Sequence, residues 1–345
     1  MRWRGKVLDN LDMIELMRLA EVKILLACLV SLLVTGVAGK ILLPALRRAK
    51  AEQRIRENGP IWHNAKQGTP TMGGFMFIIG IAITCLTVGM DDIIKGELGH
   101  IYILVFSLAF CAIGLMDDLT KLRKKRNLGL TAGKKFILQL IAAAAFVILM
   151  DVAGFLTPNL FVPFVNATIR IPMPIYYVFA AFVIVGTVNS VNITDGVDGL
   201  ATGVTIPVAI CFTMLALIWG YTTSGIFAAA LAGGLVTFLM FNFHPARVIM
   251  GDTGSLFLGG AICATAFAMD VPLVLIPLGI VFIVEALSDI IQVTYFKLTH
   301  GKRIFKMAPL HHHFEMCKWS ERKIFVIFTA VSAVFAALTY FTVKR

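Results

Sequence analysis

The sequence predicts an all-α, polytopic membrane protein in which residues 1–345 form a single integral membrane domain. Composition is the first reason, because the chain is 58% hydrophobic and 15% charged, whereas soluble domains are roughly 45–50% apolar and about 25% charged. Hydropathy is the second reason. The mean hydropathy of +0.85 comes from many separate apolar runs, each near the length that a bilayer-spanning helix needs.

Ten apolar runs are candidates for transmembrane helices, since a span needs about 20 residues. They comprise residues 22–46, 73–90, 100–116, 135–153, 174–191, 200–219, 224–243, 255–269, 271–293 and 324–343. The run at 255–269 is shorter than a span needs, which leaves the division between the eighth and ninth spans open. Between the fourth and fifth runs, residues 155–174 hold three prolines and alternating apolar residues, which predicts a small hairpin.

Basic residues set the predicted orientation of these spans. The segments that follow the odd-numbered runs carry almost all of the loop Lys and Arg, whereas those after the even-numbered runs hold only Lys95 and Arg170. Positively charged loops stay in the cytoplasm, so we expect five cytoplasmic loops and both termini on the periplasmic side. The formal net charge of +11 then reflects these loops, and we expect no nucleic-acid partner.

Two adjacent carboxylates, Asp117 and Asp118, end the third apolar run, and a basic segment follows them directly. The C-terminal end of a helix carries partial negative charge, and two neighbouring carboxylates repel each other, so a positive partner is expected. One interpretation is ion pairing with Lys121 and Arg123, which is common on exposed surfaces. The other interpretation is a divalent cation.

Two further polar segments lie on the basic side of the predicted membrane domain. Lys66 and Thr71 belong to a Gly- and Thr-rich turn that suits a phosphate, although it is not a Walker A loop; the alternative is that Thr71 caps the next helix. Asn192, Asp195 and Asp198 lie in a loop that has no Lys or Arg. This loop suits a nucleoside or a hydrated cation, while ordinary Asp-Gly turns are the alternative.

The segment from Asn242 to Ser255 contains Asp252, which either caps the eighth predicted span or binds a metal ion. Mg²⁺ is typically held by one or two carboxylates together with substrate phosphates and water. One carboxylate here and one at 117/118 would therefore suffice.

The long last loop holds three consecutive histidines, His311, His312 and His313. They cannot all face one way, and a zinc pair normally has another spacing, so we expect contacts with phosphate oxygens. Within the ninth run, Glu285 is an intramembrane carboxylate, which indicates a function unless a structural partner neutralises it. Gln292 follows in the same run.

Taken together and in order, these motifs resemble the bacterial phospho-N-acetylmuramoyl-pentapeptide transferases, which belong to the polyprenyl-phosphate N-acetylhexosamine-1-phosphate transferase superfamily. The resemblance runs from about Arg47 to Lys323 and depends on the Asp117-Asp118 pair with the basic residues after it and on residues 68–74, 192–200, 250–255 and 309–315. Each motif alone is weak, whereas the ordered set is specific. Thr253 stands where many members have Val, which is a small β-branched exchange.

The resemblance implies a ten-span enzyme of the bacterial cytoplasmic (inner) membrane that forms a homodimer and has its active site facing the cytoplasm. Such an enzyme transfers phospho-MurNAc-pentapeptide from UDP-MurNAc-pentapeptide to undecaprenyl phosphate, which gives lipid I and UMP, and it requires Mg²⁺. Asp252 and Asp118 would bind the metal, and the implied catalytic residues are Asp117, Asp118, Asp252 and His312. The implied substrate-binding residues are Lys66, Thr71, Asn192, Asp195, Asp198, Asn242, Gln292, His311 and His313.

Two alternative functions remain open from the sequence. A related transferase that moves N-acetylglucosamine-1-phosphate would share the carboxylates and the metal. A proton-coupled transporter could use intramembrane carboxylates as a relay, but the polar motifs lie in loops and no internal repeat is visible, which argues against a transporter. For the transferase we expect one-step attack by the lipid phosphate, with a route through an aspartyl-phosphate as the rival mechanism.

Overall fold

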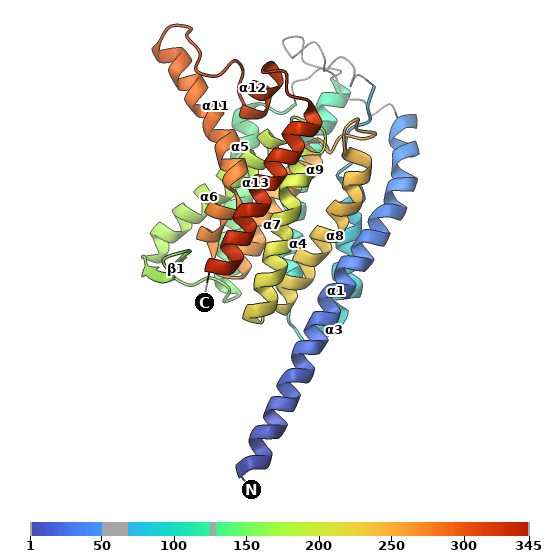
Figure 1. Ribbon diagram of the computed structural model, residues 1–345, viewed down its shortest axis with the longest axis vertical. Coiled ribbons are helices and arrows are strands. Elements are labelled where there is room, and N and C mark those ends of the chain that lie inside the picture. The colour runs from blue at the N-terminus through green and yellow to red at the C-terminus, as the bar shows by residue number, and fades with distance from the viewer. Residues whose placement is uncertain (1, 50–67, 125–128, 344–345) are drawn as a thin grey trace.

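The computed structural model describes residues 2–49, 68–124 and 129–343, with side chains from residue 19 onward. Figure 1 shows a bundle of helices with one small hairpin at its side. The longer helices are α1 (Arg2–Arg48), α2 (Phe75–Thr87), α4 (Gly99–Arg123), α5 (Ala132–Val152), α6 (Met173–Thr194), α7 (Leu200–Trp219), α8 (Thr222–Asn242), α9 (Gly251–Ala268), α11 (Ile280–Leu298) and α13 (Glu321–Thr342). The short elements are α3 (Met90–Ile94), β1 (Asn159–Val162), β2 (Ala167–Arg170), the 3₁₀ helix η2 (Pro272–Val274), α10 (Leu275–Leu278) and α12 (Leu310–Met316).

Each of the ten predicted apolar runs is helical in the structure. Seven of the described helices are long and apolar enough to cross a membrane, namely α1 from Leu19 onward, α4, α5, α6, α7, α8 and α13. The second run forms the shorter helix α2, and the ninth run is broken, because Pro272–Leu278 and α11 meet at an angle of 78°. The prediction of a mostly helical, polytopic membrane protein is therefore confirmed.

Helix α9 lies at the centre of the bundle, between α4 and α6. Every residue from Thr253 to Ala268 is buried, and many of these residues are Gly or Ala. Small side chains let neighbouring helix backbones approach closely, which favours helix packing within a membrane. The position of α9 therefore determines where its N-terminal residues, including Asp252, meet the other helices.

The structure corrects one prediction about a helix end and excludes two helix caps that the sequence had left open as alternatives. Helix α4 continues past Asp117 and Asp118 to Arg123, so the two carboxylates lie within the helix and the basic residues Lys121 and Arg123 occupy its last turn, where the helix dipole favours them. Thr71 does not cap α2, which begins after Gly74. Asp252 is not the cap of α9 either, because it lies within the first turn of that helix.

The hairpin predicted within residues 155–174 is present. Strands β1 and β2 pair antiparallel, with Asn159 opposite Arg170 and Val162 opposite Ala167. Asp270, just after α9, accepts hydrogen bonds from the Thr157 hydroxyl at 2.7 Å and the Thr157 backbone N–H at 3.4 Å. This contact attaches the segment before the hairpin to the end of the central helix.

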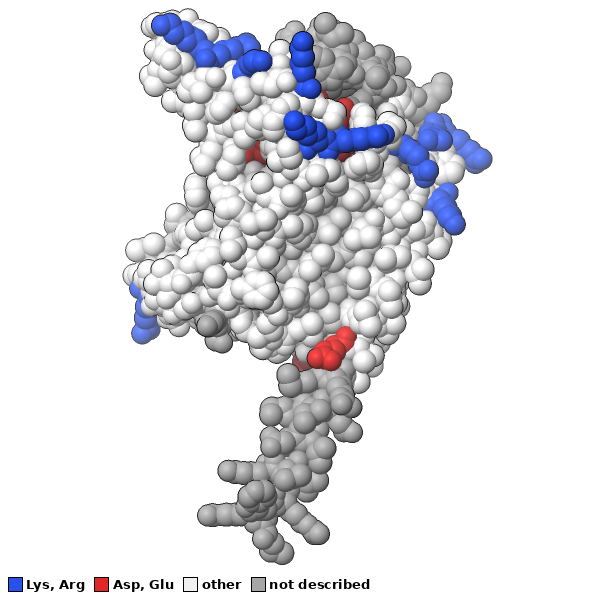
Figure 2. Space-filling model, viewed as in Figure 1, with Lys and Arg blue, Asp and Glu red and all other residues white. Residues whose placement is uncertain are grey.

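The charged side chains are unevenly distributed over the molecule. Figure 2 shows most of the visible Lys and Arg side chains at one end, above an almost uncharged band, with a further basic group low on one side. Helix α12 lies at the basic end, and both chain ends point the other way (Figure 1). This charge separation along the bundle axis agrees with the loop asymmetry in the sequence.

Candidate active site

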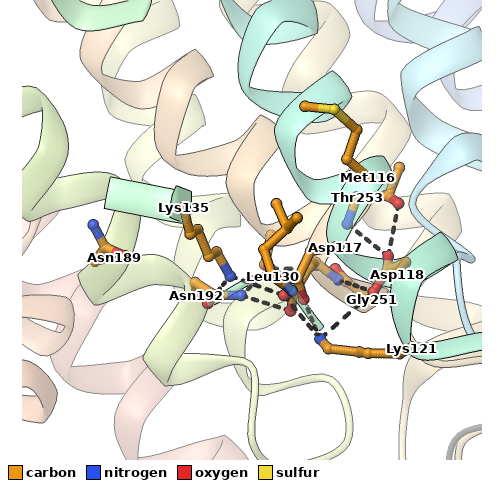
Figure 3. Close-up of polar contacts among 12 residues, drawn as sticks. Met116, Asp117, Asp118, Lys121, Leu130, Lys135, Asn189, Asn192, Gly251 and Thr253 are labelled. Carbon is orange, nitrogen blue, oxygen red and sulfur yellow. Dashed lines mark hydrogen bonds and ion pairs between the residues drawn. The ribbon is translucent and has the colours of Figure 1, made fainter. Parts of the chain in front are cut away.

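Three carboxylates from two helices meet at the basic end of the bundle. Asp117 and Asp118 come from α4 and Asp252 comes from the first turn of α9, and oxygens of all three lie within 4.8 Å of one another. Asp117 and Asp118 are each only 3% exposed. Figure 3 shows Asp117 and Asp118 of this cluster with Lys121, Lys135 and Asn192 around them. The sequence placed these residues in separate loops, and the fold brings them together.

A close approach of the two helices makes this meeting possible. A Cβ atom added to Gly114 of α4 would lie 2.1 Å from the backbone oxygen of Asp252, so only glycine fits there. Asp117 and Asp118 follow three and four residues later, on the same helix face. Gly251, with a φ of +75°, adopts the left-handed conformation that glycine tolerates best, and it starts α9 beside Asp118.

Asp118 holds the N-terminus of α9. Its carboxylate accepts hydrogen bonds from the Thr253 backbone N–H at 2.9 Å, the Thr253 hydroxyl at 2.7 Å and the Asp252 backbone N–H at 3.2 Å. The first N–H groups of a helix lack partners within the helix, and a negative charge near them is favourable. Asp118 therefore stabilises the buried start of α9 from the neighbouring helix.

Asp252 is surrounded by positive and amide groups. Its Oδ2 atom lies 2.9 Å from Lys121 Nζ and 2.8 Å from Lys135 Nζ, while Asn192 Nδ2 donates to Oδ1 at 3.0 Å. Burial opposes the charge of Asp252, but Lys135 and Lys121 outweigh this effect and hold its pKa well below the usual range. Asp252 is therefore a carboxylate at neutral pH.

Asp117 faces a different set of neighbours. Its Oδ1 accepts the Leu130 backbone N–H at 2.8 Å, and its Oδ2 lies 2.7 Å from Lys121 Nζ. Lys121 thus links Asp117 and Asp252, and it lies 3.8 Å from Asp118 as well. The ion pairs with Lys121 that the sequence allowed are present, although they belong to a largely buried cluster rather than to a solvated helix end.

Lys135 is a site residue that the sequence analysis missed. Besides Asp252, its Nζ lies 3.2 Å from Asn192 Oδ1. One turn further along α5, Gln139 exchanges hydrogen bonds with Asn189 of α6. A polar residue within the apolar run at 135–153 marked the inward face of this helix, and Lys135 lies four residues before Gln139 on that face.

The segment that carries Thr71 also packs against the start of α9. Backbone hydrogen bonds join Ile249 N–H to the Pro70 oxygen, at 2.8 Å, and Gly73 N–H to the Ile249 oxygen, at 2.9 Å. A Cβ atom at Gly251 would lie 2.9 Å from Thr71 Oγ1 and 2.8 Å from Asp118 Oδ2. Thr71 is thus beside the carboxylate cluster, whereas Lys66 lies outside the described residues.

Two of the expected substrate-binding amides are engaged with the protein backbone. Asn242 donates to the Val248 oxygen at 3.0 Å and accepts from Thr202 at 2.9 Å, which fixes the loop before α9. Gln292 accepts the backbone N–H groups of residues 304 and 305 and donates to the oxygen of residue 305. Both residues shape loops at the basic end.

A second group of ionisable side chains joins three segments of the chain. His244 Nδ1 lies 3.1 Å from Asp198 Oδ2 and 3.5 Å from Glu321 Oε2, and the Ala246 backbone N–H donates to Asp198 at 3.0 Å. These contacts connect the loop after α6, the loop after α8 and the start of α13. Asp195 follows α6 directly in the same loop as Asp198.

The three consecutive histidines face three different partners, as predicted. His311 Nδ1 lies 2.8 Å from Glu285 Oε2, and His312 Nδ1 lies 2.6 Å from Glu315 Oε2. His313 Nδ1 accepts the backbone N–H of Lys306 at 3.1 Å. Glu285 therefore has a buried partner, which is His311.

The carboxylate cluster has the donors that a divalent cation needs. Mg²⁺ prefers oxygen ligands and usually combines one or two carboxylates with phosphate and water. Asp117, Asp118 and Asp252 supply such oxygens within 4.8 Å of one another, and the lysines beside them could bind phosphate oxygens. This combination can stabilise a reaction between two phosphorylated molecules.

The comparison with known proteins agrees with the motif order. The family model described as glycosyl transferase family 4 matches residues 100–270. A relative from Clostridium perfringens (strain 13 / Type A) is 43% identical over 327 residues, which cover 92% of this chain and 98% of the relative. A relative from Caldanaerobacter subterraneus subsp. tengcongensis is 43% identical over 93% of this chain and 99% of its own. A third, from Geobacillus kaustophilus, is 44% identical over 92% of this chain and 97% of its own. All three are named phospho-N-acetylmuramoyl-pentapeptide-transferase, so neither the N-acetylglucosamine-1-phosphate alternative nor the transporter alternative is favoured.

Proposed function

The chain belongs to the phospho-N-acetylmuramoyl-pentapeptide-transferase family, and from this premise we propose the reaction that it catalyses. The donor is UDP-MurNAc-pentapeptide and the acceptor is undecaprenyl phosphate. The products are lipid I and UMP, which makes this the first membrane step of peptidoglycan synthesis. The observation that carries the proposal is the meeting of Asp117, Asp118 and Asp252 with Lys121 and Lys135.

Mg²⁺ is part of the proposal, with Asp252 and Asp118 as its ligands and Asp117 close by. Support comes from the three carboxylates, whose oxygens lie within 4.8 Å of one another and match the oxygen donors that Mg²⁺ prefers. When bound, the ion would neutralise charge on the pyrophosphate and make UMP a better leaving group.

The transfer itself depends on positioning and on charge neutralisation, because an anionic nucleophile must attack an anionic pyrophosphate. A phosphate oxygen of the lipid forms a bond to the sugar-linked phosphorus of the donor, while the bond from that phosphorus to the UMP oxygen breaks. Asp117 orients the acceptor phosphate or accepts its proton. Lys121 and Lys135 turn their ammonium groups from Asp252 toward the phosphate oxygens that carry the negative charge.

The rival mechanism transfers the phospho-sugar first to an aspartate and then to the lipid. Incubation of the purified enzyme with labelled UDP-MurNAc-pentapeptide, without lipid acceptor, distinguishes the two routes. We expect no covalently labelled protein and no UMP. A labelled enzyme that forms lipid I after addition of undecaprenyl phosphate would overturn the one-step mechanism.

The membrane arrangement is also a proposal. We expect ten spans in the bacterial inner membrane, with both termini in the periplasm and the basic end in the cytoplasm. The gathering of Lys and Arg at the end that holds the carboxylate cluster supports this orientation (Figure 2), and a basic surface there attracts both anionic substrates. The proposal also includes substrate-binding roles for polar residues of the sequence motifs. They are Lys66, Thr71, Asn192, Asp195, Asp198, Asn242, Gln292 and His311 to His313. We also propose that the protein forms a homodimer, which a mass measurement in nanodiscs would test.

The decisive assay measures UMP release by the purified protein in the presence of undecaprenyl phosphate and Mg²⁺. UDP-MurNAc-pentapeptide should support release, whereas UDP-N-acetylglucosamine should not. The opposite preference would assign the chain to a different sugar donor. Release that continues without the lipid acceptor would indicate a hydrolase instead of a transferase.

A further inference from the structure

A carboxylate and an imidazole form a fully buried pair between α11 and α12. Glu285 is 0% exposed and His311 is 1% exposed. His311 Nδ1 lies 2.8 Å from Glu285 Oε2, and the His311 backbone N–H donates to Glu285 Oε1 at 3.1 Å. One carboxylate therefore holds both the backbone and the ring of His311. Such a two-point contact restricts ring rotation more than a single hydrogen bond does.

The other ring nitrogen of His311 points to a different part of the molecule. His311 Nε2 is buried and has no hydrogen-bond partner among the described residues. A Cβ atom added to Gly196 would lie only 2.3 Å from it, so the ring edge lies against the backbone between Asp195 and Val197. A buried polar atom without a partner is costly, so a ligand atom that reached this nitrogen would be stabilised by it.

The turn at Gly196 connects His311 to the carboxylate cluster. Asn192, four residues earlier on α6, donates to Asp252. Asp195 and Asp198 flank the same turn. The unpartnered nitrogen is thus aimed at the loop that we assign to the donor nucleotide, at the end of the helix that contacts Asp252.

We propose that Glu285 is a positioning residue, which holds the His311 ring so that Nε2 meets a polar atom of the UDP-linked donor at the Gly196 turn. The inference rests on the proposed function and adds to it a residue that acts through His311. In this arrangement a Glu285 oxygen accepts the hydrogen on His311 Nδ1, which leaves Nε2 for the donor. In metal sites, a carboxylate behind a histidine fixes the ring and its tautomer in the same way.

The first test is the Glu285→Gln variant of the full-length protein, in which the side chain keeps its size but loses its charge. We expect kcat/KM for UDP-MurNAc-pentapeptide to fall roughly 10- to 100-fold, the range expected when one hydrogen bond to a charged group is lost. The KM for undecaprenyl phosphate should stay unchanged. The matched control is Asp151→Asn, which also removes a carboxylate that accepts a hydrogen bond, here from Tyr177, and it should keep wild-type kinetics.

A double-mutant cycle tests whether Glu285 acts through His311. The variant Glu285→Gln/His311→Gln should be no less active than His311→Gln alone, since residues that act as one unit are not additive. The Gly196→Ala variant reaches the same ring from the opposite side, because its new methyl group must displace Nε2. It should reproduce the defect in donor kcat/KM.

A spectroscopic readout separates positioning from a purely structural role. In protein labelled with ¹⁵N-histidine, the ring signals that disappear in His311→Gln belong to His311. In wild type they should report a protonated Nδ1, and the Nε2 signal should shift when UDP-MurNAc-pentapeptide is added. In Glu285→Gln the proton distribution between the two nitrogens should change.

The outcomes are distinguishable. Wild-type donor kinetics in Glu285→Gln, or additive effects in the double mutant, would overturn the positioning role. Unchanged His311 signals in Glu285→Gln would overturn it as well, even in a less stable protein. If the wild-type protein released no UMP, the proposed function would fail, while the ring signals of His311 would still show whether Glu285 fixes its tautomer.

Discussion

Replacement of Asp252 by Asn is the sharpest test of the carboxylate cluster. In the structure Asp252 Oδ2 pairs with Lys121 Nζ at 2.9 Å and Lys135 Nζ at 2.8 Å. An amide keeps the shape of the side chain but removes the negative charge. It also places an NH₂ group where a lysine or Asn192 now donates. The variant therefore removes the interaction that holds both lysines and the one carboxylate on α9.

The expected effects on folding and on activity have different causes. The ion pairs of Asp252 are largely buried, and loss of one partner of a buried pair costs about 3–5 kcal/mol, but the loss of this carboxylate also relieves repulsion by Asp117 and Asp118, and Lys121 keeps its contact with Asp117. The free energy of unfolding should therefore fall by roughly 1–3 kcal/mol. Charge stabilisation at a phosphoryl-transfer site is worth several kcal/mol, and a loss of about 4 kcal/mol corresponds to a 10³-fold lower kcat.

The assay is UMP release with undecaprenyl phosphate over a range of Mg²⁺ concentrations, together with thermal denaturation of the same preparations. The control is Asp270→Asn, which changes the same functional group at the other end of α9, where Asp270 accepts hydrogen bonds from Thr157. It should lose some stability and keep its activity. More than about a tenth of wild-type kcat in Asp252→Asn, with Mg²⁺ dependence unchanged, would remove Asp252 from the metal site, since that loss is under 1.4 kcal/mol.

Three further predictions follow from the contacts around the cluster. Lys135→Met keeps the aliphatic stem but loses the ammonium group that contacts Asp252, so kcat/KM for UMP release should fall roughly 10- to 100-fold. Wild-type kinetics of UMP release would contradict the role of Lys135. Gly114→Ala places a methyl group within 2.1 Å of the backbone oxygen of Asp252, which should lower the free energy of unfolding by about 1–3 kcal/mol and reduce activity. An unchanged melting temperature would refute the close approach of the two helices. Asp118→Asn leaves one of the N–H or O–H donors at the start of α9 without its acceptor, so it should destabilise the protein by about 1–3 kcal/mol, which is more than Asp117→Asn does in the same denaturation assay.

The sequence predicted the helices well because each apolar run has a length that the bilayer imposes. The hairpin within residues 155–174 was also predicted correctly, since prolines and alternating apolar residues indicate turns and short strands. The ends of helices were less predictable. The third apolar run ended at residue 116, just before Asp117, whereas α4 continues to Arg123. Contacts of Lys121 and of α9 with the two carboxylates stabilise this polar last turn, which hydropathy cannot detect.

The residues of the site were predictable as motifs but not as contacts. Thr71 and Asp252 looked like helix caps, and neither is one, because the donors at the start of α9 bond to Asp118 of a different helix. These hydrogen bonds join residues that are separated by 134 or 135 positions in the sequence. No local sequence pattern encodes such a contact. Lys135 could have been found from Gln139, since two polar residues one turn apart on an apolar helix mark its inward face.

The adjacent carboxylates of α4 provide the last step of the argument. Neighbouring residues of an α-helix point about 100° apart, so Asp117 and Asp118 make mostly different contacts, although Lys121 Nζ lies 2.7 Å from Asp117 and 3.8 Å from Asp118. Asp118 faces the start of α9 and accepts three hydrogen bonds there, whereas Asp117 faces Leu130 N–H and Lys121. A pair that looks like one motif therefore makes two different sets of contacts, because Asp118 holds the start of the helix that carries Asp252, whereas Asp117 lies beside Lys121.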